Sequence, residues 1–260
     1  MEIILAYLLV GVVAGLLAGL LGIGGGIVIV PALSFLLQIT PDYVMHVAVG
    51  TSLAIVAVTA TSSAWAHSRK GTVKWPVIYR LTGGLIVGTL IGVLLVNQLS
   101  SDNLRVFFAV FELLVAIHIA IGVQTPSATV QPSMLILSIA SLTIGIVSAF
   151  AGVGGGVMLV PLLLWLGLTF KQAISTSAAC GVPIAIAGSI GFMLIGTDTS
   201  AQLPEMSTGY VYWPAFLSIA FTSVLFAPLG AKLAHALPAD VLRKIFASFL
   251  FVVGMLMFFA

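Results

Sequence analysis

A glycine-rich segment occurs twice in this chain, and both copies lie inside apolar sequence. The first copy runs from Gly22 to Pro31 and reads GIGGGIVIVP, and the second runs from Gly152 to Pro161 and reads GVGGGVMLVP. Glycine interruptions at matching positions of two apolar halves are the best sequence indication of a binding site in a membrane transporter. The pair therefore predicts a duplicated membrane chain whose site lies where the two copies meet.

The composition is that of a chain surrounded by lipid. Of the 260 residues, 61% are hydrophobic and only 6% are charged, whereas a soluble domain carries about 25% charged residues. A soluble fold cannot hide that much apolar sequence, because its surface needs polar groups. The net charge of +2 gives no indication of a nucleic-acid partner. The single Cys180 cannot form an intrachain disulfide, and we expect it to be a small buried residue.

Apolar segments of helical length fall into two sets of five. A run of about 20 apolar residues spans a bilayer as a helix. We expect an all-α polytopic membrane protein with a single transporter domain over 1–260, built from a first repeat (1–122), a linker (123–132) and a second repeat (133–260). The start lacks the basic region and cleavage site of a signal peptide, so we expect it to be the first membrane helix. The expected segments are 3–22, 27–38, 43–66, 76–97 and 104–122, followed by 133–152, 157–168, 172–196, 212–235 and 241–259.

The duplication extends beyond the glycine motif. Thr51-Ser52 is repeated as Thr176-Ser177, 125 positions later, and Leu99–Phe108 is repeated as Leu237–Phe246, 138 positions later. The separation changes only in predicted loops, which supports one duplicated unit of five segments. Small residues also recur on segment 76–97, where close spacing predicts a face for helix packing; these are Gly83, Gly84, Gly88 and Gly92.

Charged residues indicate how the chain is oriented. If every segment crosses the membrane once, eight of the nine Lys and Arg residues lie on one side, and Arg105 alone lies on the other. The positive-inside rule makes the basic side cytoplasmic, so both termini are expected outside. Because each half has five segments, an odd number, the second half is expected to be inverted relative to the first. The basic side holds Arg69, Lys70, Lys74, Arg80, Lys171, Lys232, Arg243 and Lys244.

Segments 27–38 and 157–168 are too short to span the bilayer as straight helices. About 12 residues make about 18 Å of helix, against about 30 Å of hydrocarbon core. Each is expected to be a half-helix broken from its predecessor by glycine. Two alternatives remain open: the segment and its predecessor form one re-entrant hairpin, which preserves the orientation, or the short segment alone is re-entrant, which changes the parity of crossings.

The repeated glycines have the chemistry of an anion site. Glycine allows positive φ, and successive N–H groups can converge into an anion-binding concavity. A helix beginning directly after such a turn adds its own free N–H groups and dipole. The alternative role for these glycines is close helix packing. The candidate substrate-binding residues are Gly22, Gly24, Gly25, Gly26, Gly152, Gly154, Gly155 and Gly156.

Hydroxyl and carboxyl side chains add two further candidates. The repeated hydroxyls of Thr51, Ser52, Thr176 and Ser177 can donate to an anion, or can instead bond to carbonyls of their own helix. Glu112 lies midway along segment 104–122, and an intramembrane carboxyl indicates function by default. It is a candidate carrier of a coupling proton, and the alternative is a protonated Glu hydrogen-bonded between helices.

Other chemistries find no support in the sequence. The four His residues show no metal-ligand spacing, and no nucleophile, base and orienting group occur together. We therefore expect no metal, no cofactor and no catalytic residues. The glycine motif follows no strand, so it does not predict a nucleotide site.

The paired motifs resemble the sulfite exporter TauE/SafE family, which is also described as the 4-toluene sulfonate uptake permease family and as probable membrane transporter proteins. The resemblance covers essentially the whole chain and rests on Gly22–Pro31, Gly152–Pro161, Thr51-Ser52 and Thr176-Ser177. It implies transport of a small sulfur-containing oxyanion, such as sulfite or a sulfonate, across the cytoplasmic (inner) membrane. Inverted repeats further predict alternating access about a site near the midplane.

Three alternatives to a secondary transporter remain. A passive anion channel has the same sequence requirements. A non-transporting membrane assembly subunit would leave two anion-type turns without a purpose. An integral membrane enzyme lacks a catalytic set. The expected partners are a small sulfur anion and the lipid bilayer, without nucleic acid.

Overall fold

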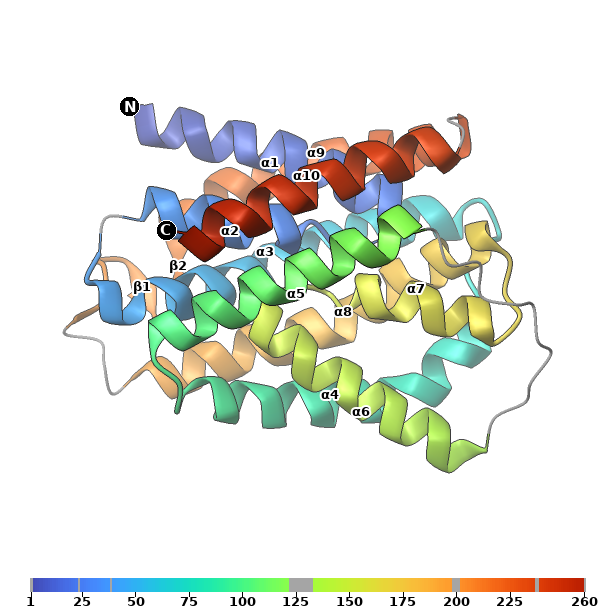
Figure 1. Ribbon diagram of the computed structural model, residues 1–260, viewed down its shortest axis with the longest axis horizontal. Helices are drawn as coiled ribbons and strands as arrows, with labels where there is room; N and C mark the ends of the chain where they lie inside the picture. Colours follow the sequence, from blue (N-terminus) through green and yellow to red (C-terminus); the bar gives the residue numbers. More distant parts are fainter. Residues whose placement is uncertain are drawn as a thin grey trace.

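The computed structural model describes residues 2–22, 24–37, 39–121, 133–197, 202–236 and 239–259, and these are almost entirely helical (Figure 1). Ten α-helices within the described ranges match the ten expected segments, and the expected linker at 123–132 lies outside those ranges. The first half (2–121) contains α1 (Glu2–Leu21), α2 (Gly26–Leu36), a short 3-10 helix (Pro41–Tyr43), α3 (Val44–Ser68), α4 (Trp75–Val96) and α5 (Ser101–Ile121). The second half (133–259) contains α6 (Met134–Ala151), α7 (Gly156–Trp165), α8 (Phe170–Ile195), β1 (Ser207–Thr208), β2 (Val211–Tyr212), α9 (Trp213–Ala236) and α10 (Ala239–Phe259).

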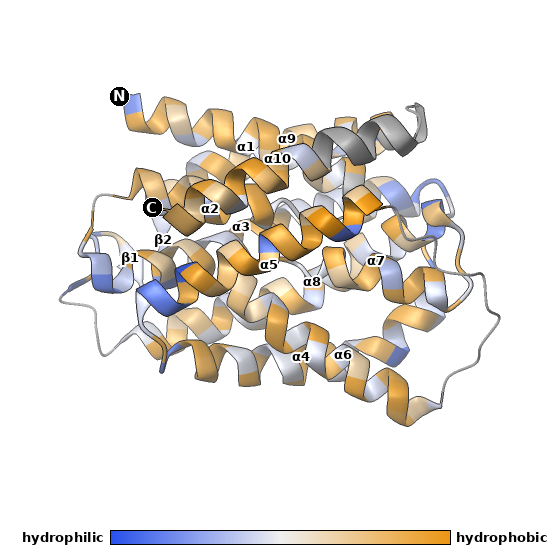
Figure 2. Ribbon diagram, in the orientation of Figure 1, coloured by the Kyte–Doolittle hydropathy of each residue, from blue (hydrophilic) through white to orange (hydrophobic). Residues whose placement is uncertain are grey.

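The helices form a bundle with the surface of a membrane protein. Seven helices in the described ranges are long and apolar enough to cross a bilayer. Figure 2 shows apolar residues along the middle of the bundle and hydrophilic residues gathered toward its two ends. Large apolar side chains of the outer helices, such as Leu94, Leu114 and Leu225, are exposed. The prediction of an all-α polytopic membrane protein is confirmed.

Helices α3 and α8 form the centre of the bundle. In their most apolar 18-residue windows, 78% and 56% of the residues are buried, against 33–39% for the other five long helices. The two helices pack on each other, and α9 and α4 pack on them in turn. A helix that is apolar on all sides is stable only when other helices or lipid surround it. Most groups carried by α3 and α8 therefore lie in the interior of the protein.

Helices α1 and α2 form a hairpin that turns back inside the bundle. In Figure 1, α1 starts at the end that holds both termini and runs inward, and α2 returns toward that same end. Helices α6 and α7 make the corresponding turn from the opposite end. The short α2 and α7 have 11 and 10 residues, and each contains a proline, Pro31 or Pro161.

Small residues allow the outer helices to approach closely. A methyl group on Gly88 would overlap the Leu142 backbone of α6, and one on Gly15 would overlap the Ser223 backbone of α9. The predicted packing face on α4 is confirmed for Gly84, Gly88 and Gly92, which all face α6. Gly83 is the exception, because a methyl group there would meet nothing within 4 Å.

The two halves of the chain interlock. Helix α1 packs on α9, α4 packs on α6, and α5 packs on α10, so each of these contacts joins the first half to the second. In the two halves, α1 corresponds to α6, α4 to α9 and α5 to α10 in sequence order. The α1–α9 contact is therefore the counterpart of the α4–α6 contact. The halves therefore do not form two separate bodies.

Candidate functional site

The two glycine turns meet in the interior of the bundle. The amide nitrogen of Gly154 lies 3.8 Å from the position that a methyl group on Gly24 would take. All the glycines of both turns are buried. The structure thus brings together two segments that lie 130 positions apart in the sequence.

Positive φ angles explain why these positions are glycine. In the first turn the φ values are 67° at Gly22, 82° at Gly24 and 80° at Gly25. In the second they are 63° at Gly152 and 72° at Gly155. A residue with a Cβ is strained in this region, whereas glycine is not. The turns break α1 from α2 and α6 from α7, and each places a new helix N-terminus in the interior.

The turns present backbone N–H groups that have no acceptor. Gly25 and Gly155 are the N-cap residues of α2 and α7, and neither helix has a side-chain cap. Their carbonyl groups accept bonds from the next turn of helix. A buried N–H group normally has a partner. Among the described residues no acceptor bonds to the N–H groups of Gly24, Gly25, Gly26, Gly154, Gly155 and Gly156.

This arrangement is suited to a small anion. The free N–H groups and the N-termini of α2 and α7, where the helix dipoles are positive, lie at these two neighbouring turns. Such a helix start binds phosphate, sulfate or carboxylate groups without a basic side chain. At membrane depth, unpaired amides need protein, water or ligand as partners.

The serine of each repeated Thr-Ser pair bonds to the glycine turn of the other half. The Ser52 hydroxyl on α3 donates to the Gly152 carbonyl at 2.8 Å. The Ser177 hydroxyl on α8 donates to the Gly22 carbonyl at 3.3 Å. Both side chains are fully buried. The first carbonyl of each motif is thus turned toward a serine of the opposite half.

The threonine of each pair bonds to the loop that precedes a long helix of the other half. Thr51 Oγ1 accepts a bond from the Tyr212 N–H at 3.0 Å. Thr176 Oγ1 accepts a bond from the Lys74 N–H at 3.1 Å. Each donor stands directly before the Trp-Pro pair that starts α9 or α4. The four hydroxyls are therefore structural partners of backbone groups in this conformation, and their contact with an anion stays a prediction.

Sequence reasoning missed two residues beside the turns. Val56 on α3 touches both turns, because its Cγ1 lies 2.7 Å and 3.1 Å from where methyl groups on Gly24 and Gly154 would be. Gly181 on α8 also faces Gly154. The two are 125 positions apart, the separation already found for the Thr-Ser pairs. That separation aligns the two positions but does not single them out, because one is valine and the other is glycine.

Glu112 is buried without a hydrogen-bond partner. Its side chain has no exposed surface, and neither carboxyl oxygen bonds to any group of the described structure. It lies on α5, which packs on α3, α6 and α10. Its expected alternative role, a hydrogen bond between helices, is not what this conformation shows.

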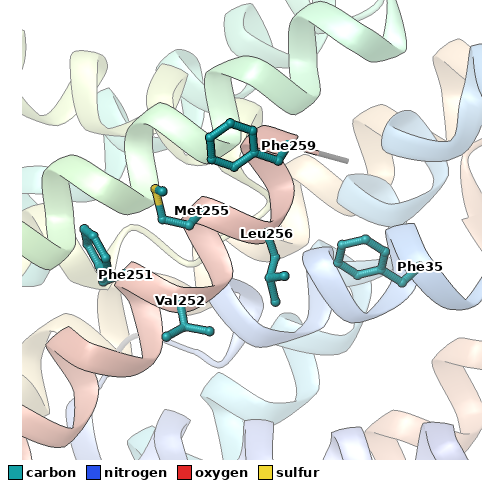
Figure 3. A pocket seen from close by; sticks show the side chains of 6 residues that line it. All are labelled: Phe35, Phe251, Val252, Met255, Leu256 and Phe259. Carbon is teal, nitrogen blue, oxygen red and sulfur yellow. The ribbon is translucent and has the colours of Figure 1, made fainter.

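An apolar groove lies on the outer surface, away from these residues. It is lined by α2 and α10 and has a volume of about 580 Å³. Figure 3 shows its side chains, none of which is polar. It has the character of a surface against lipid chains and contains no residue of the two glycine turns. Within the described residues no three His, Cys, Asp or Glu side chains come together as a metal site.

Comparison with known proteins agrees with this picture. Residues 7–257 match the model of the family described as sulfite exporter TauE/SafE. A protein of Haemophilus influenzae is 38% identical over 98% of both chains. Relatives from Methanocaldococcus jannaschii (28% identical, 96% of this chain and 93% of the relative) and Bacillus subtilis (26%, 91% and 93%) are also similar. All three carry the name probable membrane transporter protein. No solved structure matches the chain.

Proposed function

Since the chain belongs to the sulfite exporter TauE/SafE family, we propose that it is a secondary transporter for a small sulfur-containing anion, sulfite or an organosulfonate. The chain is an integral multi-pass membrane protein, and its relatives are named as transporters rather than enzymes. The proposed substrate follows from the description of the family as sulfite exporters. A binding site that consists of backbone amides fits an oxyanion, which accepts several hydrogen bonds at once.

The proposal depends above all on the unpaired N–H groups of the two facing glycine turns. Three come from the first turn and three from the second, and all belong to buried residues. Leaving a buried donor unsatisfied costs about 1–3 kcal/mol. A bound anion would satisfy these donors together, and the dipoles of α2 and α7 would stabilise its charge.

We also propose that the halves, 1–122 and 133–260, are inverted repeats in the cytoplasmic membrane. The reciprocal serine and threonine bonds support an exchange symmetry between them. With α1–α2 and α6–α7 as re-entrant hairpins, the basic loop between α3 and α4 lies at the end opposite both termini (Figure 1). The positive-inside rule then places the termini outside.

Alternating access would carry the anion between the two sides. Because α1 packs on α9 and α4 on α6, the moving bodies would each combine helices from both halves. The central pair, α3 and α8, would hold the turns between those bodies.

Glu112 is our candidate for the coupling proton. Holding an isolated charge in the interior costs several kcal/mol, so an unpartnered buried carboxyl favours its protonated form. Of the helices packed on α5, α6 has no titratable residue, α3 has His46 and His67 near its ends, and the titratable residues of α10 belong to its first turns in the sequence: Asp240, Arg243 and Lys244. A carboxyl that gains and loses a proton during the cycle would couple transport to the proton gradient.

The coupling is tested with Glu112→Gln. The variant should retain sulfite exchange between equal concentrations but lose the effect of an imposed proton gradient. Asp102→Asn, on the same helix but exposed, is the matched control and should behave like the wild type. Gradient-driven transport that persists in Glu112→Gln would overturn this role.

The transport itself is tested in proteoliposomes loaded with unlabelled sulfite. Labelled sulfite added outside should accumulate by counterflow, and sulfonates should compete better than chloride. A passive channel would give flux that does not saturate and no counterflow. Folded protein that moves none of these anions would contradict the proposed function.

A further inference from the structure

The side chain of Val56 closes the junction between the two glycine turns. It is fully buried on α3. One of its methyl groups, Cγ1, contacts the turn of the first half at Gly24 and the turn of the second half at Gly154. No bulky group can enter between the turns at this point unless Val56 moves or is smaller.

The equivalent position in the second half has no side chain. Gly181 lies on α8, 125 positions after Val56, and its Cα lies 3.3 Å from the place of a methyl group on Gly154. A methyl group on Gly181 itself would lie 3.1 Å from the Gly154 carbonyl oxygen and 3.7 Å from the Ala60 Cβ. The neighbours on this side are thus a glycine and an alanine.

The symmetry of the turns is therefore broken at one pair of positions. The amide donors are contributed equally by both halves, but the first half adds a branched side chain and the second adds none. An oxyanion group needs the donors, whereas any organic group attached to it needs space. At this junction the space is limited by the one branched side chain, Val56.

Resting on the transport function proposed above, we propose that Val56 and Gly181 set the size of anion that the protein accepts. Val56 excludes bulk from the α3 side. Gly181 lets the α8 backbone lie against the second turn, so that no side chain of α8 narrows the junction further. One methylene in an apolar site changes discrimination about 10–200-fold, so single-residue changes here should be measurable.

The experiment measures the counterflow rates of sulfite, methanesulfonate and benzenesulfonate. The ratio for each sulfonate is its rate divided by the rate of sulfite. Val56→Ala should raise the ratio for benzenesulfonate about ten-fold or more. Val56→Thr keeps the shape of the side chain and should leave the ratio near the wild-type value. Gly181→Ala should lower the ratio for methanesulfonate by a similar factor, because the added methyl group reaches Gly154.

The outcomes separate this inference from the proposed function. Sulfite counterflow with ratios unchanged in both Val56→Ala and Gly181→Ala would overturn the size role and leave the transport function standing. Should Val56→Ala fail to fold, Gly181→Ala decides the question alone. A wild-type protein that moves neither sulfite nor any sulfonate would overturn the proposed function itself.

Discussion

At the scale of single residues, Ser52 and Ser177 each bond to a glycine carbonyl in the opposite half of the chain. Each hydroxyl donates a hydrogen bond to the carbonyl of the first glycine of a turn: Ser52 to Gly152 and Ser177 to Gly22. The later amides of the turns have no acceptor among the described residues. We infer that the two serines position the turns, and that the anion is bound by the amides.

Replacing Ser52 with Ala should destabilise the protein and weaken transport. The buried Gly152 carbonyl would lose its donor, which costs about 1–3 kcal/mol. Thermal unfolding in detergent should show a lower midpoint for Ser52→Ala and a similar change for Ser177→Ala. Thr61→Ala, which removes an exposed hydroxyl bonded to its own helix, should have little effect. Equal stability of Ser52→Ala and Thr61→Ala would contradict the positioning role.

The sequence predicted which residues gather at the site but not all of their roles. The repeated residues identified both turns and both Thr-Ser pairs, which the structure brings together in the interior. The hydroxyls were expected on the anion or on their own helices, yet Ser52 and Ser177 reach the other half. Bonds between residues 100 or more positions apart depend on packing that no local pattern encodes. Val56 was missed because an apolar side chain on an apolar helix carries no local signal.

At the scale of elements, the glycine turns decide the length and direction of helices. Five glycines with positive φ interrupt apolar segments that would otherwise be two continuous helices. The interruption shortens α2 and α7 and turns them back. The sequence predicted short helices and left open whether they span; the positions of both turns within the bundle follow from contacts with α3 and α8, such as Gly24 with Val56.

Gly25→Ala should destabilise the protein more than Gly71→Ala. Both positions have positive φ, 80° and 68°, so each substitution adds about 1–2 kcal/mol of backbone strain. At Gly25 the new methyl group would also lie 2.7 Å from the Ala14 carbonyl oxygen, whereas at Gly71 it meets nothing within 4 Å. Comparison of unfolding midpoints checks this, and a larger loss at Gly71 would contradict the packing described.

The α4–α6 contact gives a second prediction at this scale. Gly88→Leu should prevent folding, because the side chain would overlap the Leu142 backbone. Gly83→Leu on the same helix should fold, because that position faces open space. Size-exclusion chromatography of the two variants distinguishes them. A monodisperse Gly88→Leu protein would show that α4 and α6 do not approach as closely as described.

At the scale of the whole molecule, helices of one half pack on helices of the other, so the halves are not two separate bodies. A two-half sequence suggests two bodies that rock against each other. The α1–α9, α4–α6 and α5–α10 contacts connect the halves throughout the bundle. The duplication was readable from sequence because it repeats residue identities, while the interlocking depends on which helices find each other in three dimensions.

The orientation proposed for the two halves predicts where introduced cysteines react. In a Cys180→Ala background, Gln202→Cys should react with a membrane-impermeant maleimide added to intact cells. Gly71→Cys, in the basic loop between α3 and α4, should react only after permeabilisation. The native thiol is buried, so its removal clears the background. The reverse pattern would overturn the orientation inferred from the basic residues.

The affinity of the purified protein for sulfite, measured by calorimetry, tests most directly whether the two glycine turns bind the anion. Wild type, Gly25→Ala, Gly155→Ala and Gly71→Ala should be compared, each checked for folding. If the facing turns hold the anion, both turn variants should bind at least about ten-fold more weakly, equivalent to about 1.4 kcal/mol, and Gly71→Ala should bind like the wild type. Wild-type affinity in folded Gly25→Ala and Gly155→Ala proteins would place the anion elsewhere and contradict the account.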